Sequence, residues 1–344
     1  MQALRIKGER DLELCDIAAP DAPGNGEVQV RIKAVALNHI DVWGWRGMAF
    51  AKRTLPVIAG AEGAGEIVAM GADVTELAVG DTVALYGALT CGECPACVEG
   101  RDNFCEGSGS TGNIYGFHID GFCRELINVP ARLAVPAPDG VDAIGAALAA
   151  ITFGTSEHML FDNAKLQPGE CVLIHAGGSG IGSAAIQLAK AAGASVITTV
   201  GSDEKGDKAH ALGADHVINY RTQSFESRAR RLTNKQGVDV VFEHVGADTW
   251  PGSMFSLKRG GRLVTCGSTT GLQTKMNLFT LFQQQLRIFG SFGCTLANMR
   301  AVMEKMARGD VNPVIDSTLM LKDIKIGLER LESRDVFGKI VVTL

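Results

Sequence analysis

The sequence predicts an α/β fold in which a β-rich first part precedes a parallel sheet covered by helices on both faces. Residues 1 to about 135 hold short segments of alternating apolar and polar residues, separated by glycine turns. From residue 171 onward, strand-like and helix-like segments alternate, which is typical of a parallel sheet. The chain also holds 42 glycines, which suits the many tight turns of such a fold.

The composition excludes several classes of function. The 344 residues include 33 basic and 38 acidic ones, a net charge of −5, without the clustered basic excess that nucleic acid binding needs. No apolar run reaches the ~18 residues that a membrane span requires. The amino terminus is charged where a signal peptide would be apolar. We therefore expect a cytoplasmic protein that acts on a small molecule, with no nucleic acid or membrane partner.

The order of the expected elements follows from hydrophobic periodicity. In the first part, strands are expected at 26–37, 63–71 and 80–87, and the alanine-rich stretch 135–160 has a helical pattern. The second part is expected to contain strands at 171–176, 195–200, 216–220, 238–244, 262–266 and 286–292, with helices over 181–192 and 203–212. One or two helices and a final strand, 339–344, are expected in the tail.

A glycine-rich turn follows the strand that begins at Cys171. The run His175–Gly182 (HAGGSGIG) lies between this strand and a helix, where a dinucleotide phosphate can approach the backbone N–H groups of a helix amino terminus. An alternative is a turn that serves only helix–strand packing. The candidate cofactor-binding residues here are Gly177, Ser179, Gly180, Ile181 and Gly182.

The end of the next strand indicates which dinucleotide is bound. NAD-preferring sites carry Asp or Glu there, whereas this chain has Val200, Gly201 and Ser202, followed by Lys205. A lysine without a competing carboxylate favours the 2′-phosphate of NADPH, although Lys205 could also be an ordinary solvated lysine. The nicotinamide is expected where later strands end, at Val245, Gly246, Cys266 and Gly267.

Four of the nine cysteines fall within 15 residues. Cys91, Cys94, Cys97 and Cys105 offer four thiolates on one loop, which is the donor set of a zinc site. Four protein ligands leave no position for substrate, so one structural zinc per chain is predicted. The other five cysteines are expected to be small core residues.

With these features the chain resembles the medium-chain dehydrogenase/reductase superfamily. The resemblance rests on the cysteine loop, the glycine-rich turn and the segments GAEGAGEIVAMG and NHID. The resemblance implies a discontinuous GroES-like catalytic domain (1–152 and 289–344) around a Rossmann NADPH-binding domain (153–288). It also implies an active site in the cleft between them.

The departures from the family pattern concern its catalytic zinc. The resemblance places the three zinc ligands of the alcohol dehydrogenases at Asn38, Ala61 and Ile151, and the hydroxyl that relays the proton at Ile40. An aliphatic side chain cannot bind zinc and Asn is a poor ligand. His39, Asp41 and Glu62 could rebuild a metal site, which would make the chain a zinc-type alcohol dehydrogenase.

The resemblance is closer to the quinone oxidoreductase and enoyl reductase branch, where an Asn-x-x-Asp motif replaces the Cys. The NADPH-using members carry the pattern that here reads Gly201, Lys205, Tyr220 and Arg334. Those members usually lack the cysteine loop, so the chain belongs to a subgroup that keeps structural zinc without catalytic zinc.

Without a metal to stabilise an alkoxide, a conjugated acceptor is easier to reduce than an isolated ketone. The sequence thus predicts NADPH-dependent reduction of an α,β-unsaturated carbonyl, an enoyl thioester or a quinone. Asn38 could orient the substrate or the ribose, or simply be a turn residue, and Asp41 could fix the loop through backbone N–H groups.

The remaining expectations concern the pocket, the assembly and a non-catalytic alternative. His39 could transfer a proton or be structural, and the aromatic residues Trp43, Trp45 and Phe50 could line the pocket or the core. A homodimer, or a tetramer, is expected, because the apolar segment 286–292 would be an exposed sheet edge in a monomer. A NADPH-binding protein with little catalysis is the third possibility.

Overall fold

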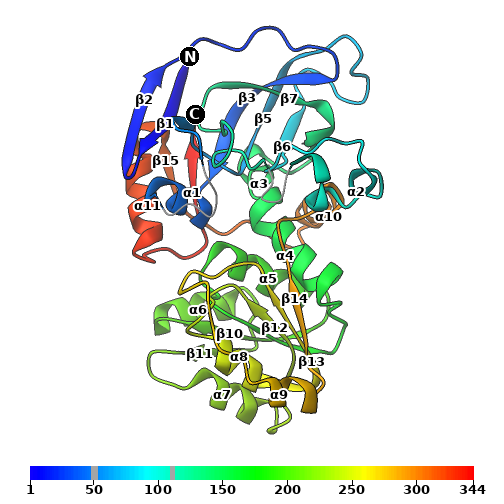
Figure 1. Cartoon of the computed structure of the whole chain (residues 1–344), viewed down its shortest axis with the longest axis vertical. Coiled ribbons are helices and arrows are strands. Elements are labelled where there is room, and N and C mark those ends of the chain that lie inside the picture. Colours follow the sequence, from blue (N-terminus) through cyan, green and yellow to red (C-terminus); the bar gives the residue numbers. More distant parts are fainter. Residues whose placement is uncertain (48–52, 109–112) are drawn as a thin grey trace. The chain divides into compact units, whose positions relative to one another are not determined.

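A computed structural model describes residues 1–47, 53–108 and 113–344, which form two compact units (Figure 1). Unit 1 comprises residues 1–154, 294–309 and 315–344, and unit 2 comprises residues 155–293 and 310–314. The division after Gly154 lies two residues beyond the boundary expected at 152. The division after Gly293 lies five residues beyond the one expected at 288, and the short segment 310–314 packs with unit 2.

Unit 1 is built on two sheets. The smaller is antiparallel, with the order β2–β1–β4: Asp11–Asp16, Gln2–Gly8 and Val57–Ile58. The larger has the order β15–β16–β3–β5–β6–β8, with β7 paired to β3: Ile315–Met320, Lys339–Thr343, Glu27–Ala36, Gly63–Met70, Thr82–Leu85, Ala134–Pro136 and Leu126–Pro130. In β3 the apolar residues Val28, Val30 and Ile32 alternate with polar ones and are buried, which gives this sheet its core face.

The end of the chain completes the larger sheet. Strand β16 pairs antiparallel with β3, placing Val341 opposite Ala36, and β15 then pairs parallel with β16. The helices and short helical turns of unit 1 are α1 (His39–Trp45), α2 (Pro95–Val98), α3 (Ala143–Ala146), η4 (Ala149–Gly154), α10 (Leu296–Ala307), α11 (Ile324–Glu332), η1 (Asp102–Phe104), η2 (Glu106–Ser108), η3 (Ala131–Leu133) and η6 (Leu321–Asp323).

Unit 2 contains a six-stranded parallel sheet with the order β11–β10–β9–β12–β13–β14. The strands are His216–Asn219, Ser195–Val200, Cys171–Ile174, Val238–Glu243, Leu257–Thr265 and Arg287–Gly290. The helices are α4 (Thr155–Glu157), η5 (His158–Asn163), α5 (Gly180–Ala191), α6 (Asp203–Ala211), α7 (Phe225–Leu232), α8 (Trp250–Ser256) and α9 (Leu278–Gln283). This is the strand order of the doubly wound dinucleotide-binding fold, and it confirms the predicted fold class.

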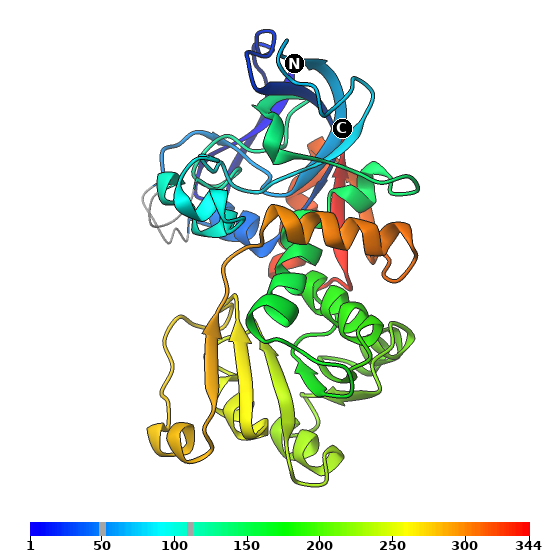
Figure 2. The same cartoon turned by 90° about the vertical axis from the view of Figure 1, so that its right-hand side faces the viewer.

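The order of the parallel sheet reverses between β9 and β12, which lie side by side. The connections that leave these two strands therefore diverge at their carboxyl ends, and ligands of open α/β sheets bind at such a point. In Figure 2 the edge strand β14, in orange, lies outermost beside β13. The apolar residues that form the core of the unit include Leu173, Ile197 and Leu263, each at most 1% exposed.

Some predicted elements differ from the observed ones. Strand β13 begins at Leu257, five residues before the expected start at 262, because a Lys-Arg-Gly-Gly run interrupts its apolar pattern. The stretch 135–160 was predicted helical, but its first residues belong to β8, and helix begins only at Ala143, since Pro136 and Pro138 disfavour helix. Among the described residues, no helix is both long and apolar enough to cross a bilayer.

Candidate functional site

The four clustered cysteines converge on one point of unit 1. Their Sγ atoms lie within 4.8 Å of one another, with Cys91 at 3.5 Å from Cys105 and 3.9 Å from Cys97. A tetrahedron with zinc–sulfur bonds of ~2.3 Å has sulfurs about 3.8 Å apart, so the cluster fits one zinc ion. The backbone N–H of Cys94 also donates to the sulfur of Cys91. With four thiolate ligands, such an ion would be structural.

Arg132, which sequence reasoning missed, supports the start of the cysteine loop. Its Nη1 donates to the Thr90 hydroxyl at 2.9 Å, and its Nη2 donates to the Thr90 carbonyl. Gly92 follows with a φ of +80°, and a Cβ there would lie 2.6 Å from the Arg132 Nε. A side chain at residue 92 would therefore displace the guanidinium from the loop.

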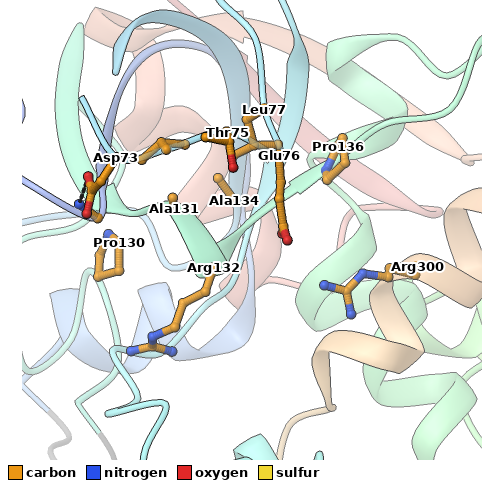
Figure 3. A pocket seen from close by; sticks show the side chains of 12 residues that line it. Asp73, Thr75, Glu76, Leu77, Pro130, Ala131, Arg132, Ala134, Pro136 and Arg300 are labelled. Carbon is orange, nitrogen blue, oxygen red and sulfur yellow. Dashed lines mark hydrogen bonds between the residues drawn. The ribbon is translucent and has the colours of Figure 1, made fainter. Parts of the chain in front are cut away.

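Arg132 also lines an open pocket of about 640 Å³ in unit 1 (Figure 3). The pocket wall carries both signs of charge, because Asp73 and Glu76 accompany Arg132 and Arg300. Asp73 already accepts a hydrogen bond of 2.7 Å from the backbone N–H of Gly26. This pocket therefore shows no converging set of polar groups, and we assign it no ligand.

A second polar cluster of unit 1 surrounds Asn38 at the start of α1. The Asn38 amide donates to the carbonyl of Ala36 at 2.9 Å and to the Glu62 carboxylate at 3.0 Å. Its carbonyl oxygen accepts a 2.7 Å hydrogen bond from the ammonium of Lys339. Both amide hydrogens are thus used within the protein, so Asn38 can accept a further hydrogen bond but has none left to donate.

Asp41 lies one helical turn after Asn38 and binds backbone groups. Its carboxylate accepts from the backbone N–H of Asn38 at 2.8 Å and from that of Ala61 at 3.2 Å. Burial raises the pKa of Asp41 to about 6, although these hydrogen bonds and the nearby Lys339 favour the charged form. The side chain connects the start of α1 to the loop that precedes Glu62.

Glu62 has no exposed surface and is saturated with hydrogen bonds. Its Oε1 accepts from the backbone N–H groups of Ile151 and Thr152, at 2.6 and 2.7 Å. Its Oε2 accepts from the Thr152 hydroxyl at 2.9 Å, from Asn38, and from Lys339 at 3.3 Å. The carboxylate therefore has no free lone pair with which to bind a metal ion.

Lys339 is the residue of this cluster that sequence reasoning missed. It is only 3% exposed and forms an ion pair with Glu62, while burial lowers its pKa against the opposing effect of the carboxylates. The sequence could have indicated this residue, because Lys339 is the first residue of a strand whose next three residues are apolar. A lysine in that place is buried only if a carboxylate is nearby.

The aromatic residues predicted near the pocket fall into different environments. Trp45 is 1% exposed in the core of unit 1, with the guanidinium of Arg10 4.7 Å from its ring. Trp43 is half-buried, and the ring of His39 meets it edge-on at 6.3 Å. Phe50 lies outside the described residues.

In unit 2 two glycines of the glycine-rich turn are required by close packing within the protein itself. A Cβ at Gly177 would lie 2.4 Å from the Thr198 hydroxyl, and a Cβ at Gly182 would lie 2.2 Å from the Ala176 carbonyl. Ser179 begins α5 and accepts from the Gly182 N–H at 3.0 Å. The candidates Gly180 and Ile181 form the first turn of this helix, where backbone N–H groups are free for an anion.

Of the residues proposed for the 2′-phosphate, Gly201 and Ser202 follow β10, Lys205 lies in α6 and Tyr220 follows β11. A Cβ at Gly201 would be 2.8 Å from the Tyr220 hydroxyl, so the tyrosine ring lies directly beside this glycine. Ser202 begins α6 and accepts from the backbone N–H of Lys205 at 3.3 Å. Arg334 belongs to unit 1, where it follows α11 with a φ of +61°.

The turns after β12 and β13 lie side by side. Gly246 has a φ of +102°, and a Cβ there would be 2.8 Å from the Ser268 Cα. A Cβ at Gly267 would lie 3.1 Å from the His244 carbonyl. The structure thus brings the candidates Val245, Gly246, Cys266 and Gly267 together, and burial raises the pKa of the Cys266 thiol to about 12, so it is not a thiolate at neutral pH.

Two further buried groups of unit 2, Glu243 and His175, were not predicted as functional. Glu243 is unexposed, and its Oε2 lies 3.6 Å from the Nε2 of His175, which is 1% exposed. Burial lowers the pKa of His175 to about 4, against the effect of Glu243, and lowers that of His244 as well. Nearby Ser253 and backbone N–H groups, together with His175, hold the pKa of Glu243 below its usual value despite burial.

Two parts of the chain match known protein families, and proteins similar over nearly its whole length are known. Residues 24–139 match the family described as alcohol dehydrogenase GroES-like domain, and residues 180–308 match the family described as zinc-binding dehydrogenase. An acryloyl-coenzyme A reductase of Metallosphaera sedula is 30% identical to this chain, and the match covers 100% of both proteins. A quinone oxidoreductase of Pseudomonas aeruginosa is 31% identical over 94% of this chain and 93% of its own. The crystal structure of an NAD-dependent alcohol dehydrogenase is 37% identical, with a TM-score of 0.94 and full coverage of both chains.

The buried ion pair of unit 1 gives a prediction about stability. Lys339→Met should lower the free energy of unfolding by about 3–5 kcal/mol, because Glu62 would be left buried without its cation. Urea denaturation, followed by hydrogen exchange of the β3 and β16 peptides, measures this loss. The double variant Glu62→Gln/Lys339→Met should lose less than the sum of the two single variants, and a loss below about 1 kcal/mol for Lys339→Met would contradict the assignment.

The two buried histidines of unit 2 predict acid sensitivity. Because the pKa of His175 and that of His244 are lower in the folded state, the unfolded chain binds more protons below about pH 6.5. Their stabilising contribution is present above that pH and is lost as the pH falls, by about 1–2 kcal/mol per pH unit. Hydrogen exchange of the β9 and β12 peptides between pH 7 and 5, corrected for the intrinsic rate, measures it. Unchanged protection over that range would be the contrary result.

Proposed function

Because this chain belongs to the medium-chain dehydrogenase/reductase superfamily, we propose that it is an NADPH-dependent reductase of conjugated acceptors that works without catalytic zinc. The acceptor would be an α,β-unsaturated carbonyl, an enoyl thioester or a quinone. Among its relatives, an acryloyl-coenzyme A reductase and a quinone oxidoreductase match almost the whole chain, and their names describe reductions of this kind.

The state of Glu62 carries the proposal. Of the groups that could rebuild a catalytic metal site, Glu62 accepts five hydrogen bonds, one of them from Lys339, and both oxygens of Asp41 accept from backbone N–H groups. A divalent ion would have to displace a buried ammonium group and break several of these bonds. This arrangement supports the proposal that the ammonium group of Lys339, and not a metal ion, supplies the positive charge beside Glu62.

Conjugation in the acceptor would make up for the missing Lewis acid. Bound NADPH would supply the hydride, and the acceptor would take it at its β-carbon, so that negative charge spreads into an enolate. Asn38 and Asp41 would act in this reaction as positioning residues. They hold the start of α1 against the 60–62 loop, and Asn38 keeps one lone pair of its carbonyl oxygen with which to accept a hydrogen bond.

NADPH would be held by residues of unit 2. The backbone N–H groups of the turn at 177–182 would bind the pyrophosphate, and Gly201, Ser202, Lys205 and Tyr220 would surround the 2′-phosphate. Val245, Gly246, Cys266 and Gly267 would lie along the nicotinamide. Arg334 is proposed as a further NADPH-binding residue on the strength of the family pattern alone.

We also propose that the chain forms a homodimer. The edge strand β14 pairs with β13 alone within the described structure. Large apolar side chains are exposed in the segments that precede and follow it in the sequence: Leu272, Leu278, Phe279, Phe282 and Phe292 are each 57–66% exposed. A second copy of the unit would cover the open strand edge together with this proposed apolar patch.

A zinc-type alcohol dehydrogenase is the second candidate function, favoured by the 37% identity to an NAD-dependent alcohol dehydrogenase. The two candidates differ in product and in metal content. With NADPH and a simple enal, the proposed function yields the saturated aldehyde, and the purified protein holds one zinc per chain. An allylic alcohol together with two zinc ions per chain would establish the alternative.

The cofactor assignment predicts a selective loss on removal of Lys205. Lys205→Ala should weaken NADPH binding by about tenfold or more and leave NADH binding nearly unchanged, because a charge-assisted contact to the 2′-phosphate is lost. Fluorescence titration with both dinucleotides measures this difference. Lys208→Ala, one turn further along α6 and paired with Glu204, is the matched control. Equal losses in both variants would refute the role of Lys205.

The dimer predicts a change of mass in solution. Light scattering of the wild-type chain at micromolar concentration should give twice the mass of one chain, and Phe282→Glu should give a folded monomer, because a charge would enter the apolar contact. Phe255→Glu changes an aromatic residue of unit 2 that is 56% exposed outside this patch, and it should leave the dimer intact. A monomeric wild-type protein would contradict the proposal.

A further inference from the structure

A chain of buried hydrogen bonds begins at Glu243, the last residue of β12. Its Oε1 accepts from the backbone N–H groups of Val245 at 2.7 Å and Gly246 at 3.1 Å. Its Oε2 accepts from the hydroxyl of Ser253 in α8 at 2.7 Å. Both Glu243 and Ser253 have no exposed surface, so these bonds do not compete with water.

The direction of the chain beyond Ser253 follows from counting protons. The Ser253 hydroxyl has one hydrogen, which it donates to Glu243, so its 2.8 Å contact with Nε2 of His175 requires the imidazole to be the donor. The Nδ1 of the neutral ring then carries no hydrogen. It accepts from the hydroxyl of Thr199, at 3.2 Å, in β10.

Thr199 in turn accepts from the backbone N–H of Ala176, at 3.0 Å. Each group in the chain therefore donates once in the same direction, from the Ala176 N–H to the Glu243 carboxylate. This direction of the hydrogen bonds requires a neutral His175. The charged or titratable groups that face it are Glu243 and His244, whose Nε2 lies 2.8 Å from the His175 carbonyl, and its low pKa keeps it neutral at neutral pH.

The two ends of this chain lie in the two turns that flank the reversal point of the sheet. Ala176 opens the glycine-rich turn with a φ of +48°, a conformation that alanine rarely adopts. Gly246 has a φ of +102° in the turn after β12. Because β9 and β12 are neighbours, the chain spans the place where a dinucleotide binds in this fold.

We propose that Glu243, Ser253 and His175 are positioning residues that hold these two turns in one arrangement before the dinucleotide binds. They touch the backbone and one another, and they act on the cofactor through the N–H groups that they orient. If the turns are already ordered, cofactor binding does not have to supply the free energy of ordering them. The cofactor therefore binds more tightly. The proposal rests on the proposed function, since it requires that unit 2 bind a nicotinamide dinucleotide.

The test removes one hydroxyl from the chain and compares it with a matched hydroxyl outside it. Ser253→Ala breaks the link between His175 and Glu243. Ser256→Ala removes an equally buried hydroxyl from the same helix, one that donates to the Gly252 carbonyl at 2.8 Å. Ser253→Ala loses two buried hydrogen bonds, one of them to a carboxylate, whereas Ser256→Ala loses one, so Ser253→Ala should lose more stability and both variants are compared at a temperature where they are fully folded.

Two measurements are made on both variants and on the wild-type chain. Fluorescence titration with NADPH and with NADH should show binding weakened about fivefold or more in Ser253→Ala, and unchanged in Ser256→Ala. Hydrogen exchange without cofactor should show the peptides of the 175–182 and 243–249 turns exchanging faster together in Ser253→Ala alone. A connected chain of hydrogen bonds predicts that a change in α8 lowers the exchange protection of both turns. An effect on local packing alone would not reach both.

The outcomes separate this proposal from the proposed function. Wild-type binding of a dinucleotide with unchanged affinity in Ser253→Ala would overturn the positioning role alone. An equal loss in Ser256→Ala would overturn it too, because the effect would then belong to the packing of α8. A wild-type chain that binds NADH but not NADPH would overturn the cofactor choice and leave this test valid with NADH. Binding of neither dinucleotide would overturn both.

Discussion

A carboxylate that is cut off from water must accept hydrogen bonds from other groups of the protein. Each unit of this chain contains such a buried carboxylate. Glu62 and Glu243 have no exposed surface. A donor or charge left unpaired in such a place costs several kcal/mol, which is a large part of the stability of a domain. The segments that carry the donors must therefore meet at the carboxylate, and the geometry of the surrounding loops follows from that.

The two carboxylates are satisfied in different ways, and the difference bears on the chemistry. Glu62 has a lysine as its partner, so the charge of this buried carboxylate is balanced by a group of the protein itself. Lys339 supplies charge but has no vacant orbital, and it cannot polarise a carbonyl as zinc does. Glu243 instead accepts from neutral donors, two of them backbone N–H groups in the turn after β12 and one the Ser253 hydroxyl in α8.

The relatives of this chain include acryloyl-coenzyme A reductases, quinone oxidoreductases and alcohol dehydrogenases, all on one fold. The fold therefore does not select the reaction, and the donors around residues 38, 62 and 151 matter more than overall similarity. The cysteine cluster is independent of this question. It lies on a loop of unit 1 that Arg132 holds at Thr90, and its four thiolates leave a metal ion no place for a substrate.

The sequence by itself determined the features whose chemistry lies within one short segment. The four cysteines occupy 15 consecutive residues, and the glycine-rich turn is recognisable because a strand precedes it and a helix follows it. Hydrophobic periodicity likewise located the parallel strands, of which the central ones, such as β10 and β12, are buried on both faces. It did not locate β15, whose IDSTLM sequence is half-exposed along its length and lacks that pattern.

The tertiary structure alone decided which buried polar groups meet. Lys339 reaches Asn38 across 301 positions of the chain, and Ser253 joins His175 across 78. Periodicity reports which face of an element is buried, but a polar residue on that face is stable only if another element brings it a partner. That partner is fixed by strand order and by packing between elements. No local pattern encodes either, so the sequence could name Asn38, Asp41 and Glu62 without showing what holds them.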